Sequence, residues 1–121
     1  MIKTIKIGDH DVEMRADGAT PYLYKTAFGG DLISFFTDQS KRENRGDIAD
    51  MATNVAYVMA RQAETPNPRE IKLSEGDMLE WLSQFEPLDV TLAADDVLEL
   101  YISTTSASSK VKKNSGQQNE T

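Results

Sequence analysis

His10 is the only histidine in this 121-residue sequence, and histidine is the side chain whose reference pKa lies nearest neutrality. It stands between Asp9 and Asp11 and follows Gly8, a group of residues typical of a solvated turn. The chain has no cysteine and no Gly-x-Ser-x-Gly motif, so no nucleophile has a recognisable base beside it. The sequence therefore predicts no catalytic residues, and we interpret His10 as a turn residue.

One acidic segment resembles the start of a calcium-binding loop. Asp9, Asp11 and Glu13 alternate as the first ligands of such a loop do. The sixth position is Met14 and the twelfth is Thr20, where the loop needs a glycine and a bidentate glutamate. The spacing therefore predicts no calcium site.

Two further patterns have a structural explanation that fits better than a ligand site. Asp95, Asp96 and Glu99 have the spacing of the solvated face of a helix. Gly29 and Gly30 lack the lysine of a phosphate-binding loop and are typical of a helix end. We expect no metal and no cofactor.

The charge of the chain is negative and unevenly distributed. The net charge is −7, but residues 103–121 carry three lysines and one glutamate, which leaves −9 for residues 1–102. Such a body repels nucleic acid and anionic membranes, so neither is expected as a partner. The charge serves solubility, a basic protein partner, or both.

Nothing in the sequence indicates export or membrane insertion. It has no apolar run of about 18 residues, and residues 1–6 interrupt their apolar side chains with lysines, unlike a signal peptide. The lack of cysteine agrees with a reducing compartment. We expect the protein in the cytoplasm.

The first segments read as a β-hairpin. Residues 2–7 and 12–16 alternate apolar and polar side chains around a turn-forming cluster. A lone hairpin is marginally stable in water, so its apolar face must pack against later segments of the chain. That face contains Ile5, Ile7, Val12, Met14 and Ala16.

The rest of the apolar pattern is helical. Thr20 is a suitable N-cap before Pro21, and Ser74 stands three residues before Asp77 in an arrangement like a capping box. Residues 88–102 have the apolar content expected of the most buried helix. The helical segments are 21–28 and 31–36, which form two helices or one bent helix, then 47–62, 74–85 and 88–102.

These elements predict one domain, residues 1–102, that is mainly α with a short N-terminal β-hairpin (α+β), in which about four to five helices form a bundle. Residues 37–46 are polar throughout and read as a loop. Residues 103–121 contain one valine and no aromatic side chain, so we expect a disordered polar tail.

The aromatic side chains of the first helical segments exceed what one narrow helix face buries. They either complete the core or remain exposed for a partner. The set is Tyr22, Tyr24, Phe28, Phe35 and Phe36.

Residues 19–32, Ala-Thr-Pro-Tyr-Leu-Tyr-Lys-Thr-Ala-Phe-Gly-Gly-Asp-Leu, carry a family resemblance. This stretch resembles the tail assembly chaperones of long-tailed phages and prophages of Gram-positive bacteria, whose pattern comes after a short strand pair. Gly30 departs from that pattern, which has a longer residue there. The matching positions are Thr20-Pro21, Tyr24, Phe28-Gly29, Asp31 and Leu32.

The resemblance implies a non-catalytic protein of the bacterial host cytoplasm, absent from the mature virion. Its implied partners are the tape measure protein, which it keeps soluble, and the tail tube protein, which it recruits. Homo-oligomerisation is implied as well. On this basis we expect Tyr22, Tyr24, Phe28 and Asp31 near a protein-binding or self-association surface.

A second hypothesis also explains an acidic chain without chemistry: an acidic inhibitor that mimics nucleic acid, or another small regulatory binding protein. A mimic needs carboxylates in a continuous stripe, whereas much of this chain mixes them with lysine and arginine. A small hydrolase or metal enzyme is disfavoured because the sequence has no cysteine, only one histidine and no Gly-x-Ser-x-Gly motif.

Overall fold

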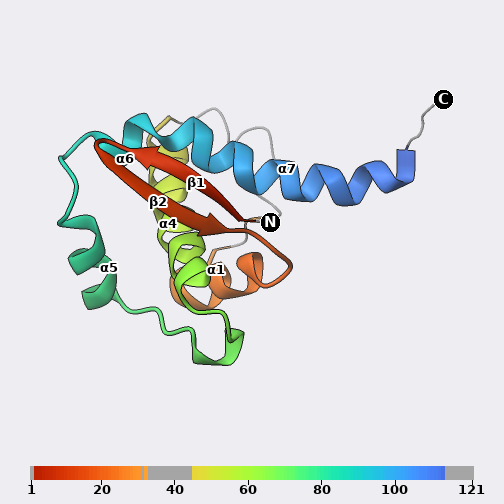
Figure 1. The fold of residues 1–121 in the computed structure, drawn as a ribbon, viewed down its shortest axis with the longest axis horizontal. Coiled ribbons are helices and arrows are strands. Elements are labelled where there is room, and N and C mark those ends of the chain that lie inside the picture. The colour runs from red at the N-terminus through yellow and green to blue at the C-terminus, as the bar shows by residue number, and fades with distance from the viewer. Residues whose placement is uncertain (1, 31, 33–44, 114–121) are drawn as a thin grey trace.

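The computed structural model describes residues 2–30, 32 and 45–113, with side chains up to residue 103 and from residue 46 in the second stretch (Figure 1). The described part of the chain contains a two-stranded antiparallel sheet, five α-helices and one 3₁₀ helix. The predicted α+β class, a helical fold with an N-terminal hairpin, is confirmed.

The hairpin consists of β1 (Ile2–Ile7) and β2 (His10–Arg15), which pair with Ile5 opposite Val12 and Ile7 opposite His10. The second strand thus begins at His10, earlier than the sequence pattern indicated, and the turn is only Gly8-Asp9. The alternation predicted the buried face correctly, because period-two side chains share one side of the sheet. Ile5, Ile7, Met14 and Ala16 are buried, and Val12 is partly buried.

Helix α1 (Thr20–Phe28) starts with Pro21 near its N-terminus and ends at Gly29, whose φ of 78° is left-handed. The Gly29 N–H donates to the Lys25 carbonyl at 2.7 Å, which closes the helix as the sequence predicted. The prediction that Thr20 is the N-cap was wrong. The N-cap is Ala19, and Thr20 is the first helical residue.

The Thr20 hydroxyl serves a buried contact with α4 instead of a cap. It accepts from the Asp17 N–H at 3.0 Å and donates to Gln62 Oε1 at 2.7 Å. Gln62 Nε2 then donates to Asp17 Oδ1 at 3.0 Å. This closed set of hydrogen bonds satisfies the buried polar groups and fixes the start of α1 against the end of α4.

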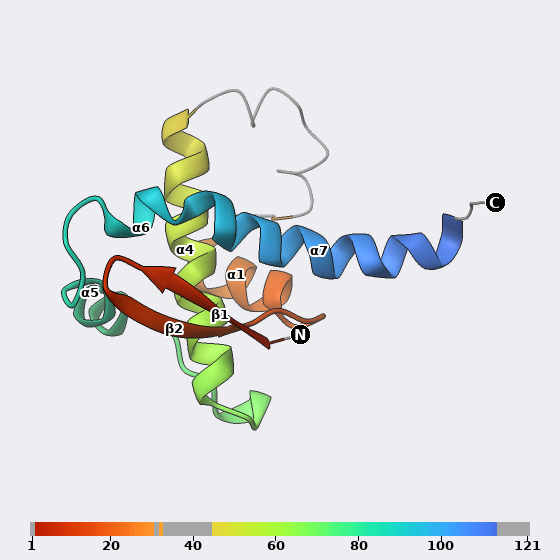
Figure 2. The ribbon, with the colours of Figure 1, turned by 45° about the horizontal axis from the view of Figure 1, so that its top comes forward.

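Helix α4 (Arg45–Glu64) is the centre of the molecule. It contacts the hairpin, α1, α6 and α7, and Figure 2 shows these elements around it. Residues 55–60 are all buried, so this middle part of α4 is covered on every side. Ala52, Ala56 and Ala60 recur at four-residue spacing, and their small side chains let neighbouring elements approach closely.

After α4 the chain forms a 3₁₀ helix (Pro68–Glu70) and then α5 (Glu75–Leu82), α6 (Asp89–Leu92) and α7 (Ala94–Lys113). The single helix expected over residues 88–102 is broken at Ala93. The expectation that it is the most buried helix was wrong as well, because that place belongs to α4.

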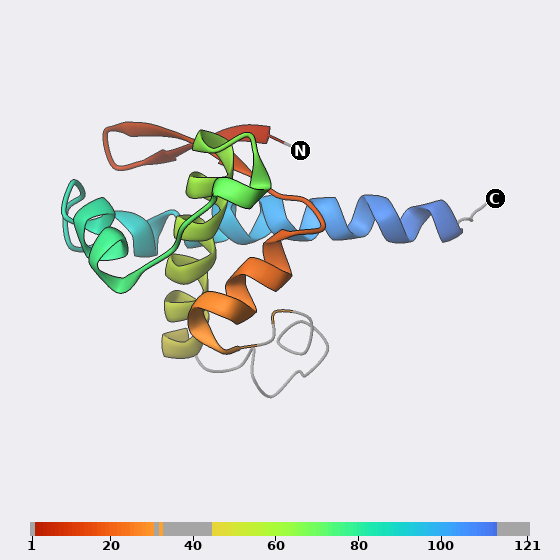
Figure 3. The same ribbon diagram turned by 90° about the horizontal axis from the view of Figure 1, so that it is seen from below.

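Helix α7 extends further than the composition indicated. Its backbone continues past the expected domain boundary at 102 to Lys113, and all three views show its distal end projecting away from the rest of the fold (Figure 3). The expected tail therefore begins within this helix. The remainder of the expected tail, and most of the expected loop 37–46 and helix 31–36, lie outside the described residues.

Candidate functional site

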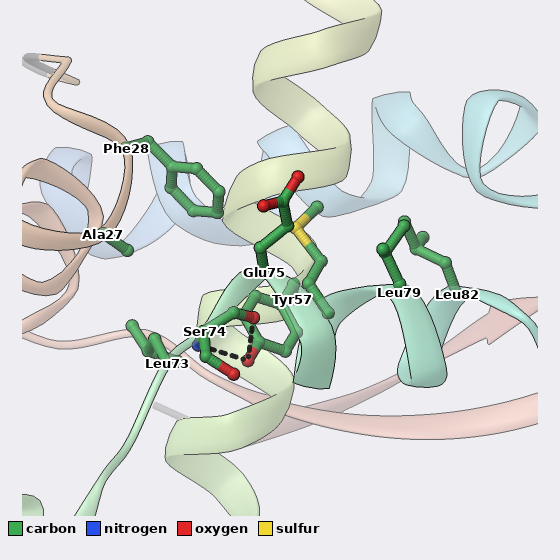
Figure 4. A pocket seen from close by; sticks show the side chains of 9 residues that line it. Ala27, Phe28, Tyr57, Leu73, Ser74, Glu75, Leu79 and Leu82 are labelled. Carbon is green, nitrogen blue, oxygen red and sulfur yellow. Dashed lines mark hydrogen bonds between the residues drawn. The ribbon is translucent and has the colours of Figure 1, made fainter.

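An apolar groove opens between the C-terminal end of α1, the middle of α4 and the inner side of α5 (Figure 4). It has a volume of about 490 Å³, within the roughly 300–1,000 Å³ typical of ligand clefts. It is open to solvent, and most of its walls are aliphatic or aromatic. The residues that line it are Ala27, Phe28, Tyr57, Leu73, Ser74, Glu75, Met78, Leu79 and Leu82.

The floor of the groove is held by a polar cluster between α4 and α5. Asp77 accepts from the Tyr57 hydroxyl at 2.6 Å and from Arg61 Nε at 2.7 Å. Arg61 Nη2 also donates to the second Asp77 oxygen at 3.2 Å, and its Nη1 contacts Glu64. The Arg61 guanidinium lies 5.7 Å from the Tyr57 ring centroid, within cation–π range. The cluster ties the N-terminal turn of α5 to α4.

These contacts change the protonation equilibria of the cluster. Hydrogen bonds from Arg61 and Tyr57 lower the pKa of the Asp77 carboxyl. Burial raises the pKa of the Tyr57 phenol, and Asp77 adds to that shift. Burial opposes the charge of Arg61, but Asp77 and Glu64 outweigh it and raise the pKa of the guanidinium. Each of these pKa shifts favours the protonation state in which the Asp77 carboxylate accepts from Tyr57 and Arg61.

Ser74 has the N-cap role that its position predicted, since its Oγ accepts from the Asp77 N–H at 3.1 Å. The reciprocal half of a capping box is absent, because the Asp77 carboxylate is turned to α4. The Ser74 N–H instead donates to the Tyr57 hydroxyl at 3.3 Å (Figure 4). One tyrosine on α4 thus joins two residues at the start of α5.

The other end of α5 is attached through edge-to-face and tilted contacts between aromatic rings. The Trp81 ring lies 5.8 Å from Tyr57 and 5.1 Å from Phe85, and Phe85 meets His10 edge to face at 5.2 Å. This row joins α4, α5 and the tip of the hairpin. His10, exposed on β2, therefore contacts an aromatic ring, and the hypothesis that it is merely a solvated turn residue needs that correction.

The structure separates the four residues expected near a binding surface. Tyr22 is 72% exposed but does not line the groove, whereas Phe28 does. Tyr24 is only 7% exposed and lies behind Phe28, with ring centroids 5.1 Å apart, so it supports the wall without offering a contact surface. Asp31 lies outside the described residues.

The α5 side of the groove was missed at the sequence level. The pattern placed Met78, Leu79 and Leu82 in the helix expected over residues 74–85 without predicting a groove there, and Leu79 is 61% exposed. A signal was present: Met78, Leu79, Trp81, Leu82 and Phe85 cover more of a short helix than one buried stripe. Only Trp81 among them is fully buried.

The groove offers contact area and little chemistry. Its described lining residues include no histidine, lysine or cysteine, and their hydroxyls belong to Tyr57 and Ser74, which already bond within the fold. Among the described residues, no three histidine, aspartate or glutamate side chains gather as metal ligands would. No helix in that part of the chain combines the length and hydrophobicity needed to cross a bilayer.

No protein-family model matches the chain, and no similar protein was found among curated proteins or solved structures.

Proposed function

We propose that this protein is a non-catalytic chaperone that binds another polypeptide through the groove, and specifically a tail assembly chaperone of a long-tailed phage or prophage. The single observation that supports binding is an open apolar groove continued by the exposed Leu79. Open grooves with mainly apolar linings are the usual form of a binding site in folded proteins.

The narrower assignment is supported by the stretch at residues 19–32 and by the hairpin-then-helices order. In this proposal the client is the tape measure protein, whose long apolar helices need cover until the tail tube protein assembles around it. The protein acts in the host cytoplasm, alone or as a homo-oligomer, and leaves before the virion matures. It uses no cofactor and catalyses no reaction.

The test is co-expression with a fragment of the tape measure protein encoded in the same genome. Co-expression should move that fragment from the pellet to the soluble fraction, and an acidic protein of similar size should not. An unchanged pellet, or a genomic neighbourhood without a long tape measure gene, contradicts the assignment.

The nucleic-acid mimic remains an alternative because of one observation. Between Lys72 and Lys110 the chain has eight acidic residues and no lysine or arginine, so the carboxylates are less interspersed there than elsewhere. A mimic depends on this charge and not on an apolar groove. Binding that responds to charge substitutions but ignores substitutions of groove leucines would favour it.

A further inference from the structure

The groove has an apolar interior and an acidic border on the same side. Glu75 lines it, and Figure 4 shows its carboxylate at the mouth between Phe28 and Leu79. Glu80, exposed on the same helix, is not among the residues that line the groove. Within the described part of the chain, Glu75 has no hydrogen bond or ion pair, whereas Asp77 is occupied by Arg61. Residues 73–109, which include α5, contain only negative formal charges. The border therefore has one carboxylate available to a cationic partner, within a segment of uniformly negative charge.

The walls of the groove determine what backbone conformation the partner has. The described lining residues come from α1, α4, α5 and the turn before α5, and none of them belongs to a strand. An extended segment would find no sheet edge there and would bury unsatisfied backbone groups against Phe28, Met78 and Leu79. A helix satisfies its own backbone and offers side chains at i, i+3, i+4 and i+7 to an apolar groove.

From these observations we propose that the groove binds one amphipathic, cationic helix of the client. Its leucine-like side chains pack against Phe28, Met78 and Leu79, and a lysine or arginine side chain pairs with Glu75. This inference rests on the proposed function only in that a client polypeptide supplies the helix. The charge of the groove border distinguishes this client from an apolar helix without basic residues.

The direct test uses a dye-labelled helical peptide of leucine and lysine, with leucine at i, i+3, i+4 and i+7, and measures its binding by fluorescence anisotropy. Leu79→Ser should weaken binding about tenfold, because it removes apolar contact area from the wall of the groove. Leu92→Ser is the matched control, since Leu92 is 79% exposed and lies on α6 outside the groove. It should leave affinity unchanged.

Ala27 is exposed on the opposite wall of the groove. The larger side chain of Ala27→Gln blocks the groove without changing α5, so this variant should weaken binding as Leu79→Ser does. Circular dichroism confirms that each variant is folded. Glu75→Gln should weaken binding about threefold, while Glu99→Gln on α7 should not. A peptide with glutamate in place of lysine, or with central prolines, should not bind.

Equal losses for Leu79→Ser and Leu92→Ser would overturn the inference, as would binding that neither groove variant affects. So would a wild-type dimer that Leu79→Ser converts to monomer, because the occupant would then be a second copy of the chain. The two proposals fail separately. If both groove variants still solubilise the tape measure fragment, only the groove inference falls, and if the wild type binds the peptide but solubilises no fragment, only the proposed function falls.

Discussion

At the scale of single residues, Gly8 shows how a turn and a tertiary contact impose one residue type. Its φ of 61° is left-handed, and a Cβ there would lie 2.2 Å from Asp89 Oδ2. Asp89 cannot move freely, because the same oxygen accepts from the Glu86 N–H at 2.9 Å before α6. The hairpin turn and the start of α6 therefore fit together only without a side chain at this position.

Gly8→Ala is expected to lower the free energy of unfolding by about 2–3 kcal/mol, through backbone strain and the lost Asp89 contact. Gly29→Ala is the matched control, because Gly29 also has a positive φ but has open space around it. It should cost only about 1 kcal/mol. Urea unfolding measures the free energy of unfolding of both variants. Equal decreases would show that the Asp89 contact has no effect.

Asp77 gives a second prediction, in acid. Its pKa is lowered in the folded state by Arg61 and Tyr57, so its stabilisation is complete above the unfolded value near 3.9. That stabilisation is lost as the pH falls through the lower folded value. Asp77→Asn should therefore cost about 1 kcal/mol at pH 7, a modest figure because the side chain is 35% exposed.

The cost of Asp77→Asn should shrink toward the acid end of the folded range, as wild-type Asp77 also becomes neutral. Urea titrations of both proteins from pH 7 to pH 3 measure this difference. Asp95→Asn on α7 provides the control, and a difference between wild type and Asp77→Asn that does not vary with pH would contradict the prediction.

At the scale of elements, α5 and α4 differ in how they are held. Residues 55–60 of α4 are buried on all sides, whereas α5 is attached by the Asp77 cluster at one end and the Trp81–Phe85 ring pair at the other. Local opening depends on the number of buried contacts that must be broken. We infer that α5, which forms one wall of the groove, opens more readily than the rest of the fold.

Hydrogen exchange should accordingly show weaker protection for amides of α5 than for amides of α4. Phe85→Ala should lower the opening free energy of α5 by about 1–2 kcal/mol, because Phe85 is half-buried between Trp81 and His10. Leu98→Ala, a half-buried residue of α7, should leave α5 exchange unchanged. Identical protection of α4 and α5 in the wild type would refute the interpretation.

At the scale of the whole molecule, charge acts in opposite directions on folding and on binding. The chain carries −7 overall, and residues 73–109 contain only negative formal charges. Repulsion among them opposes the compact state, and salt screens it. Attraction between the groove border and a cationic helix is screened by the same ions.

Raising sodium chloride from 20 to 300 mM should therefore raise the melting temperature of the protein by roughly 2–5 °C. The same change should weaken its binding of the leucine–lysine peptide several-fold. Calorimetry and anisotropy measure the two effects on one sample. Salt dependences of the same sign would indicate that the acidic border does not contribute to binding.

The sequence by itself determined the α+β class and the alternation of the hairpin. Side chains two apart share a strand face, and Pro21, Gly29 and Ser74 act on the backbone next to them, so these local signals were sufficient. Thr20 was misread because its hydroxyl has a partner 42 positions away in Gln62, which no local pattern contains.

Only the tertiary structure decided which apolar residues became core and which became the groove. Tyr24 and Leu79 are both apolar side chains of short helices, yet one is buried and the other is largely exposed. That outcome depends on how α5 sits against α4, which is set by Asp77, Tyr57 and Arg61 across 16 to 20 positions of sequence. The burial of a side chain depends on which residues lie next to it in space, and these residues cannot be read from a single sequence.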